Sequence, residues 1–383
     1  MTEKLYYASA YLKAFDATVT KCEKADKGFI VTLDKTAFYP EGGGQPCDKG
    51  KLNDISVFDV QESGEDVIHY ITKEIPVGTS VHGVIDWERR FDLMVQHSGE
   101  HIVSGFINAR FGYNNVGFHM GADMITVDLD GDMTKEQLKE IEAAVNDYIW
   151  QNHHVEVLYP SPEELKALKY RSKKELEGEV RIIRFPGGDT CACCGTHVDT
   201  TAEIGLVKLI SVQKFHEGVR IEMICGKRAY EYCAKVVEEN SAISNLLSAK
   251  VFETSAVVER LLNENQQLKI KLSESENNML DMIAENYVGI SEKIVLNKKN
   301  LTPDTVRKLA AALIEQNSGL VAVFSGDEEN GYKYAVAQKD GDLKQLVKDM
   351  NTALNGRGGG KPFFTQGSVN AKWDEINAFF ADK

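Results

Sequence analysis

The chain has 383 residues, of which 43% are hydrophobic, and carries a formal net charge of −14. This length suits two to three domains with real cores. The negative charge argues against unspecific nucleic-acid binding, which depends on phosphate contacts, but leaves room for a specific RNA held through local basic patches. No apolar run approaches the roughly 20 residues of a membrane span, and the N-terminus lacks a signal-peptide pattern. We therefore expect a cytoplasmic protein without a membrane partner.

The apolar pattern divides the chain into four regions, and together they predict an α+β protein. Residues 1–88 alternate apolar and polar positions between Gly and Pro, which is typical of strands, and predict a barrel-like β domain with a glycine-rich loop. Residues 89–228 mix helical and strand patterns. Residues 229–285 contain no Gly or Pro and predict a long helix. Residues 286–383 predict a small α/β domain.

Two helices in the second region have clear boundaries. Residues 89–112 repeat apolar positions at spacings of three and four, and Gly112 suits the C-terminal cap. Thr134 and Gln137 have the spacing of a capping box at the start of the next helix. Each helix should therefore begin and end close to these residues.

The region 229–285 carries a heptad pattern whose two rows are Val251, Val258, Asn265, Leu272, Met279 and Thr254, Leu261, Leu268, Ser275, Met282. A polar residue such as Asn265 in the first row is typical of a coiled coil, where it fixes the register. The pattern favours a homodimer formed through residues 229–285. The alternative is a helix that packs on its own protein, because Thr and Ser weaken the second row.

The seven cysteines are irregularly spaced, which favours reduced thiols over a disulfide framework. Three of them lie in "CACCGTH", residues 191–197, and predict a metal site. His97 and His101 are four apart on the predicted helix, so both imidazoles share one face. Cys193 and His197 have the same spacing and make a second half-site, and thiolate with imidazole suits Zn²⁺.

Several alternatives stay open for this site. Four donors within residues 191–197 would be too cramped for a closed site, but Cys191 or Cys194 could replace Cys193 as the ligand. The two histidines could also be ordinary polar residues of a helix face, and the cysteines buried thiols. If three side chains bind the ion and water takes the fourth place, the site would be of the catalytic kind.

Several segments resemble the alanyl-tRNA editing domains of alanyl-tRNA synthetases and of the free-standing AlaX proteins. The motifs are "HSGEH", "CCGTHV", the loop "TAFYPEGGGQPCDKG", and the segments "GFHMGADMITVDLDG" and "VRIEMICGKRAY". "NGRGGGKP" resembles the DHH-associated C-terminal domain of the synthetase. The motifs run from residue 36 to residue 361, and because the loop begins about 40 residues in, we expect no synthetase catalytic domain before it. The resemblance is to a long-form AlaX protein.

The resemblance implies an aminoacyl-tRNA deacylase that hydrolyses tRNA(Ala) mischarged with serine, with glycine as a further candidate. It implies one Zn²⁺ per chain, held by His97, His101, Cys193 and His197. A second, hydrolytic site is needed because a pocket built for alanine discriminates weakly against small analogues. The rival hypotheses are a non-catalytic tRNA-binding factor, an enzyme that edits Ser-tRNA(Thr), and a metallopeptidase, against which the absence of HExxH argues.

Substrate-binding residues are predicted in the loop around residue 43. Gly42, Gly43 and Gly44 permit a close approach of the backbone, and their N–H groups could hold an oxyanion or a ribose; an ordinary tight turn is the alternative. Gln45 could orient substrate or water. The resemblance implies that Thr36 reads the serine hydroxyl, whereas a plain strand threonine is the other interpretation.

The remaining candidates are a general base and a tRNA contact. His119 could act as a base or contact RNA, although such a histidine is more often structural, and the acidic alternatives are Glu41 and Glu100. Arg357 and Lys361 flank glycines in a segment suited to a phosphate backbone. An ordinary basic loop is the alternative there.

Overall fold

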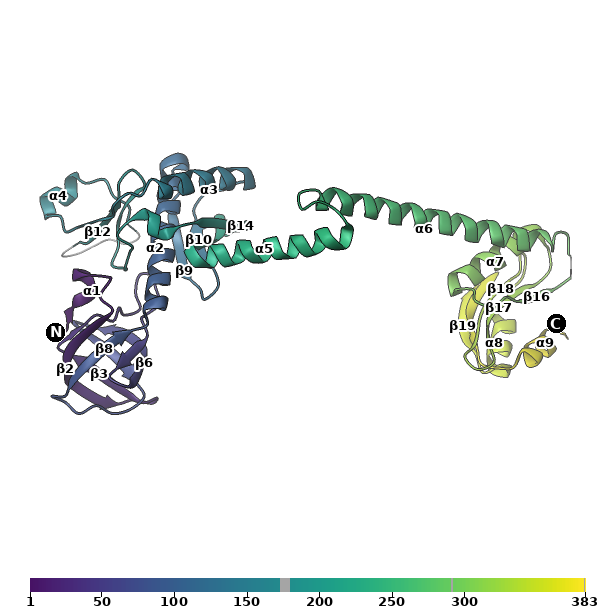
Figure 1. The fold of residues 1–383 in the computed structure, drawn as a ribbon. Helices are drawn as coiled ribbons and strands as arrows, with labels where there is room; N and C mark the ends of the chain where they lie inside the picture. Colours follow the sequence, from purple (N-terminus) through teal and green to yellow (C-terminus); the bar gives the residue numbers. More distant parts are fainter. Residues whose placement is uncertain (173–179, 291, 382) are drawn as a thin grey trace. The chain divides into compact units, whose positions relative to one another are not determined.

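The computed structural model describes residues 1–172, 180–290, 292–381 and 383, and mixes helices with several sheets, which confirms the α+β class (Figure 1). The chain forms two compact units, Met1–Ala242 and Ile243–Lys383. Within the described residues, no helix is both long and apolar enough to cross a membrane.

Six antiparallel strands near the N-terminus pair in a closed cycle in the order β2-β3-β7-β6-β5-β8. They are β2 (Ala14–Lys24), β3 (Phe29–Leu33), β5 (Gly50–Leu52), β6 (Ile55–Ser63), β7 (Asp66–Ile71) and β8 (Ser80–Ile85). Alternate residues of β8 are buried, as the period of a strand requires, and fill the interior. A short strand β1 (Glu3–Lys4), followed by α1 (Leu5–Ala8), pairs in parallel with β4 (Lys35–Thr36).

Helix α2 (Trp87–Phe111) follows the barrel directly and confirms the helix predicted over residues 89–112. Asp86 caps its N-terminus by accepting a hydrogen bond from the backbone N–H of Arg89. Gly112 ends it in the left-handed conformation, with φ 76°. The middle of α2 is buried on every side, so its histidines lie in the interior of the unit.

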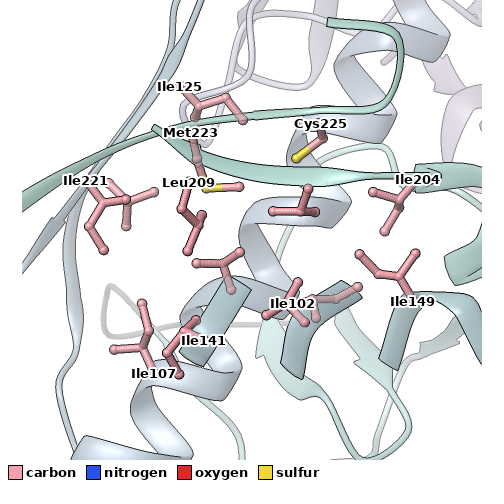
Figure 2. Close-up of a cluster of buried hydrophobic side chains, with 14 of the residues drawn as sticks. Ile102, Ile107, Ile125, Ile141, Ile149, Ile204, Leu209, Ile221, Met223 and Cys225 are labelled. Carbon is pink, nitrogen blue, oxygen red and sulfur yellow. The ribbon is translucent and has the colours of Figure 1, made fainter. Parts of the chain in front are cut away.

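The core of the first unit lies between a sheet and two helices. The sheet has the order β14-β15-β10-β9, and its strands are β9 (Asn115–Met120), β10 (Ile125–Leu129), β14 (Val207–Phe215) and β15 (Gly218–Cys225). Helix α3 (Lys135–Trp150) packs beside α2 and begins with the predicted capping box of Thr134 and Gln137. Figure 2 shows Ile102 of α2 and Ile141 of α3 beneath Met223 of the sheet.

A smaller sheet carries the cysteine motif. Its strands are β11 (Glu156–Leu158), β12 (Ile182–Phe185) and β13 (Asp189–Ala192), in that order, with α4 (Pro162–Ala167) and the short 3-10 helix η1 (Thr201–Ile204) nearby in the chain. Strand β13 ends one residue before Cys193. The motif loop is therefore held by a strand at one end and by η1 at the other.

The prediction of one continuous helix over residues 229–285 is wrong. The chain instead forms α5 (Gly226–Leu247) and α6 (Thr254–Glu285). Ser248 adopts a left-handed conformation with φ 50°, and the hydroxyl of Ser244 donates to the carbonyl oxygen of Ala249. This local side-chain bond gives the backbone an alternative to continued helix, although the sequence has no Gly or Pro there.

The second unit is a sheet covered on both faces. The sheet has the order β16-β17-β18-β20-β19, formed by β16 (Ile294–Asn297), β17 (Val321–Asp327), β18 (Gly331–Ala337), β19 (Arg357–Lys361) and β20 (Phe364–Val369). Helix α7 (Pro303–Gln316) and the end of α6 pack on one face. Helices α8 (Lys344–Ala353) and α9 (Trp373–Ala381) pack on the other. Strand β19 is an edge strand and is fully exposed.

Candidate metal centre

Four of the predicted ligands meet in the first unit: His97 and His101 from α2, and Cys193 and His197 from the loop after β13. Their possible ligand atoms all lie within 4.8 Å of one another. The centroids of the three imidazole rings are 4.7 to 5.1 Å apart. The three histidines are buried, and Cys193 is half-buried.

Two glycines make this convergence possible. A side chain on Gly99, between the two helix histidines, would collide with Cys225 of β15, since a Cβ there would lie 2.3 Å from its Sγ. A Cβ on Gly195 would lie 2.2 Å from Cε1 of His97. The motif loop therefore passes against the imidazole of His97 only because residue 195 has no side chain.

The four residues fit a zinc ion. His197 is buried, and neither of its ring nitrogens has a hydrogen-bond partner among the described residues, an arrangement that costs about 1–3 kcal/mol unless a ligand compensates it. Nε2 of His97 lies 3.5 Å from Sγ of Cys193. A tetrahedral ion with Zn–N about 2.0 Å and Zn–S about 2.3 Å would place such atoms about 3.5 Å apart.

The charges of the cluster favour a thiolate. Burial would raise the pKa of Cys193, but the imidazoles of His97, His197 and His101 outweigh it and hold this pKa well below its ordinary value. Burial would also lower the pKa of His101, yet Cys193 and the carboxylate of Asp189 raise it well above its ordinary value. Burial lowers the pKa of His197 to about 3. A thiolate and a neutral imidazole are the forms that bind zinc, so binding of the ion would displace the proton of His101.

Neither of the two alternative thiols belongs to the group of His97, His101, Cys193 and His197. Cys194 is exposed and belongs to neither group of metal-ligating side chains found among the described residues. Cys191 is buried on β13 and lies in a second group with His101 and Asp189. Among the described residues, Cys193 is thus the cysteine that is grouped with all three histidines.

Gln45 comes from the glycine-rich loop and reaches the same cluster. It is fully buried, and its Oε1 lies 2.9 Å from Nδ1 of His97. Oε1 also accepts a hydrogen bond from the backbone N–H of Thr196, and Nε2 donates to the hydroxyl of Thr196. In this arrangement Oε1 and one of the two N–H donors of the amide are engaged within the protein, so the substrate contact predicted for Gln45 would have to use the remaining N–H.

Thr36 is also fully buried, at the end of β4. Its hydroxyl lies 2.9 Å from Nε2 of His69 and accepts a hydrogen bond from the backbone N–H of Phe38. No surface of Thr36 is open to a ligand in this conformation. Its predicted contact with a serine hydroxyl would need this local arrangement to open.

The glycines form a tight turn beside the cluster. Gly42 and Gln45 exchange two backbone hydrogen bonds, and the central residues Gly43 and Gly44 have φ values of 60° and 85°. Positive φ at both central positions is the requirement of a type I′ turn. A Cβ on Gly44 would lie 2.5 Å from the ring of Phe118, which stacks on His97 with centroids 5.4 Å apart.

His119 is not brought to the cluster. It is exposed on β9, next to Phe118, and alternate residues of a strand face opposite sides. Because Phe118 faces His97, His119 points to the other face of the sheet. The structure therefore places the aromatic residue of "GFHMG", and not its histidine, against the site.

The acidic alternatives also lie in other surroundings. Glu100 is buried and accepts hydrogen bonds from Ser104 and Asn115. Glu41 is exposed and accepts one from Gln61, 3.2 Å away. Neither belongs to a group of metal-ligating side chains in the described part of the chain.

The side chains that contact the proposed ligands were not predicted from the sequence. Asp189 lies 3.0 Å from Nδ1 of His101 and is buried. Arg171 binds this carboxylate through Nε and Nη2, each at 2.8 Å. No spacing signal marked them, since Asp189 is 88 residues from His101. Phe118 and Thr196 could have been predicted, because they lie within the motifs "GFHMG" and "CCGTHV".

The predicted tRNA-binding residues lie in the second unit. Arg357 and Lys361 occupy the two ends of β19, and both are exposed. A neighbouring hollow of about 440 Å³ is lined by Lys344, Lys348 and the glycines of β19, among other residues. Glycine backbone with nearby cations suits an anionic ligand.

Comparisons with known proteins give matches to three family models. Residues 2–89 match class II (A) tRNA synthetases, and residues 180–222 match the second additional domain of threonyl and alanyl tRNA synthetases. Residues 289–382 match the DHHA1 domain. The three matches follow one another along the chain.

Individual relatives match over almost the whole length. The alanyl-tRNA editing protein AlaX-L of Pyrococcus horikoshii is 29% identical, with 98% of this chain and 96% of the relative covered. Aarsd1 of Danio rerio, also an alanyl-tRNA editing protein, is 27% identical over 97% and 96%. An alanine–tRNA ligase of Ignicoccus hospitalis is 27% identical, with 94% of this chain and 40% of the ligase covered.

Among solved structures, the C-Ala domain of Aquifex aeolicus alanyl-tRNA synthetase is 17% identical, with a TM-score of 0.22, and covers 23% of this chain and 87% of that domain. This score is too low to add to the sequence matches. Those matches extend from one end of the chain to the other and include the segment that carries Cys193 and His197. Over almost its whole length the chain is similar to alanyl-tRNA editing proteins.

Proposed function

We propose that the protein is a trans-editing aminoacyl-tRNA deacylase that hydrolyses tRNA(Ala) mischarged with serine, and more slowly with glycine. The observation that carries the proposal is the convergence of His97, His101, Cys193 and His197 in a chain related to alanyl-tRNA editing proteins. We assign one zinc ion per chain to these residues. The unpartnered nitrogens of the buried His197 support that assignment.

The side chains at the proposed site would hold the ion, shield it from water and fix the loop that carries His197. When bound, zinc would supply Lewis acidity toward the ester carbonyl or toward water. The thiolate of Cys193 and the three imidazoles would hold it. Phe118 covers one face of His97 and limits access of bulk water from that side. Gln45 fixes the loop against Thr196, next to His197.

The turn at Gly43 and Gly44 would bind the reacting ester. Among the described residues, neither N–H has an acceptor within the protein, and both residues are exposed. Gly44 packs on Phe118, which stacks on His97, so the turn lies close to the proposed metal. Two backbone donors placed there would stabilise the negative oxygen that develops during hydrolysis.

Thr36 and His119 have proposed roles in serine selection and in RNA contact. Thr36 would distinguish serine from alanine only if its hydrogen bond with His69 opens when substrate binds. His119, on the exposed face of β9, fits an RNA contact better than a general base.

The second unit would bind tRNA through β19 and form a homodimer through α6. Arg357 and Lys361 on exposed β19 would contact the phosphate backbone. On α6 the apolar residues Leu268, Leu272 and Met282 of the heptad rows are 62 to 68% exposed. A second copy that covers them in a coiled coil would explain why such a row persists on a helix surface.

Deacylation of four purified substrates tests the proposal: Ser-tRNA(Ala), Gly-tRNA(Ala), Ala-tRNA(Ala) and Ser-tRNA(Thr). We expect rapid loss of serine from tRNA(Ala), slower loss of glycine, and no loss of alanine. Loss of serine from tRNA(Thr), with Ser-tRNA(Ala) spared, would instead assign the protein to the threonine system. A folded, zinc-loaded protein that spares all four esters would be a tRNA-binding factor without this activity.

A further inference from the structure

The hydrogen bonds of Gln45 determine which nitrogen of His97 faces the cluster. The backbone N–H of Thr196 can only donate, so the Gln45 atom 3.1 Å from it must be the carbonyl oxygen Oε1. Nδ1 of His97, 2.9 Å from the same oxygen, must then carry the proton. In the neutral imidazole Nε2 is then the unprotonated nitrogen, and it lies on the side of Cys193, 3.5 Å away.

Asp189 determines which nitrogen of His101 faces the cluster, and it does so with a charged carboxylate instead of an amide. Both oxygens of Asp189 accept hydrogen bonds from the guanidinium of Arg171, the arrangement of an ionised carboxylate, which only accepts. Nδ1 of His101, 3.0 Å from Oδ2, therefore donates to it. Gly105, one helical turn after His101, permits this approach, because a Cβ there would lie 2.7 Å from Cβ of Asp189.

Asp189 is held in this position from its other side. The guanidinium of Arg171 binds it with two hydrogen bonds of 2.8 Å, a fork that fixes both oxygens. The second group, formed by His101, Asp189 and Cys191, could be a second metal site or a support of the first. The contact of Arg171 with Asp189 favours the support. A cation placed there would lie beside the guanidinium, so the group suits the support of one metal site and not a second site.

We propose that Gln45 and Asp189 are positioning residues of the metal centre, which turn Nε2 of His97 and of His101 toward the ion. The proposal rests on the metal site assigned under the proposed function. His197 is the contrast: no described residue pairs with either of its nitrogens. Outer partners of this kind orient ligating histidines, and their loss typically lowers metal affinity about 10–100-fold.

The test measures zinc affinity of the full chain by competition with a chromophoric chelator, together with the visible spectrum of the Co²⁺-loaded protein. Asp189→Asn keeps the size of the side chain and removes its charge. Gln45→Met keeps the length and removes the acceptor. The matched control is Asp128→Asn, because Asp128 also binds an arginine, Arg220, through two hydrogen bonds but touches no histidine of the cluster.

We expect both positioning variants to bind zinc about 10–100-fold more weakly and to shift the Co²⁺ bands, and the control to do neither. Folded variants with unchanged affinity and spectrum would overturn the proposal. If Asp189→Asn does not fold, Arg171→Lys, which keeps the charge but loses the fork, should still weaken zinc binding; unchanged affinity there would equally overturn it. If the unaltered chain takes up no zinc, the metal site itself is wrong, and that failure is distinct.

Discussion

Oε1 of Gln45 lies 2.9 Å from Nδ1 of His97, although the two residues are 52 positions apart and belong to different parts of the first unit. Gln45 lies in the loop between strands of the barrel, and His97 lies on the helix that carries half of the proposed metal site. The glycine-rich loop of the barrel thus contacts one of the proposed metal ligands directly. Changes on either side of this contact should affect the same properties.

Gly195→Ala should weaken zinc binding. Its Cβ would lie 2.2 Å from the ring of His97, which is stacked on Phe118 and bonded to Gln45 and so has little room to move. We expect about a tenfold or greater loss of zinc affinity, corresponding to about 1.4 kcal/mol. Gly359→Ala is the control for zinc binding, because a Cβ there has no atom within 4 Å. Equal affinity of the two variants would contradict the steric account.

Asp48→Asn should strongly destabilise the first unit. Asp48 and Arg90 form an ion pair in which both side chains are 0% exposed, and Arg90 also donates to the carbonyl oxygens of Ala10 and Ala37. Removing one partner leaves a buried charge, which costs about 3–5 kcal/mol. Chemical denaturation should show this loss.

The comparison variant for Asp48→Asn is Glu140→Gln. Glu140 pairs with Arg110 on the surface, where both side chains are about half exposed. An exposed pair contributes about 0–1 kcal/mol, so the free energy of unfolding should change little. Similar losses in the two variants would show that the burial of Asp48 is not what makes its ion pair important.

His69→Gln should make the stability of the first unit less sensitive to acid. Burial lowers the pKa of His69 from 6.5 to about 4. Between these values the unfolded chain binds a proton that the folded chain does not, so stability is full above pH 6.5 and falls as the pH drops toward 4. Glutamine does not titrate and can still bond to Thr36.

The measurement for His69→Gln is the free energy of unfolding between pH 4 and 7. A single such group contributes a slope of up to about 1.4 kcal/mol per pH unit. The variant should lose a slope of this size relative to the unaltered chain. Parallel curves for the two proteins would show that His69 is not the group responsible.

Leu268→Glu should convert the proposed dimer to a monomer. Leu268 lies in a heptad row of α6 and is 64% exposed in the single chain, so a coiled-coil partner would bury it. Ile270→Glu is the matched control, since Ile270 is also exposed on α6, at 42%, but lies outside both rows. Light scattering should give half the mass for the first variant only. A monomer before any substitution would refute the dimer.

The sequence predicted those features that follow from local pattern. Helix α2 was recognised from its apolar spacing and Gly112, and the capping box at Thr134 from the residue three positions on. The four metal-ligating candidates were found because each pair shares a spacing of four and the residue types are rare elsewhere in the chain. These signals lie within one helix or one loop.

The features that were missed depend on contacts across the fold. Asp189 supports His101 from 88 residues away, and nothing in its own neighbourhood distinguishes it from a surface aspartate. The break at Ser248 arises from a side-chain bond of Ser244, a residue that also occurs in continuous helices. His119 was predicted from its residue type alone, whereas the placement of β9 turns the neighbouring Phe118 toward His97.

The most direct test of the central claim is the rate at which Ser-tRNA(Ala) loses serine on the metal-stripped and the zinc-reloaded protein, with Cys193→Ala beside Cys194→Ala. The proposed zinc-dependent deacylation predicts that stripping abolishes the activity and zinc restores it. It also predicts that Cys193→Ala stays inactive with zinc, whereas Cys194→Ala, which lacks an exposed thiol outside the cluster, responds like the unaltered chain. Undiminished hydrolysis by the stripped protein, or by folded Cys193→Ala, would contradict it.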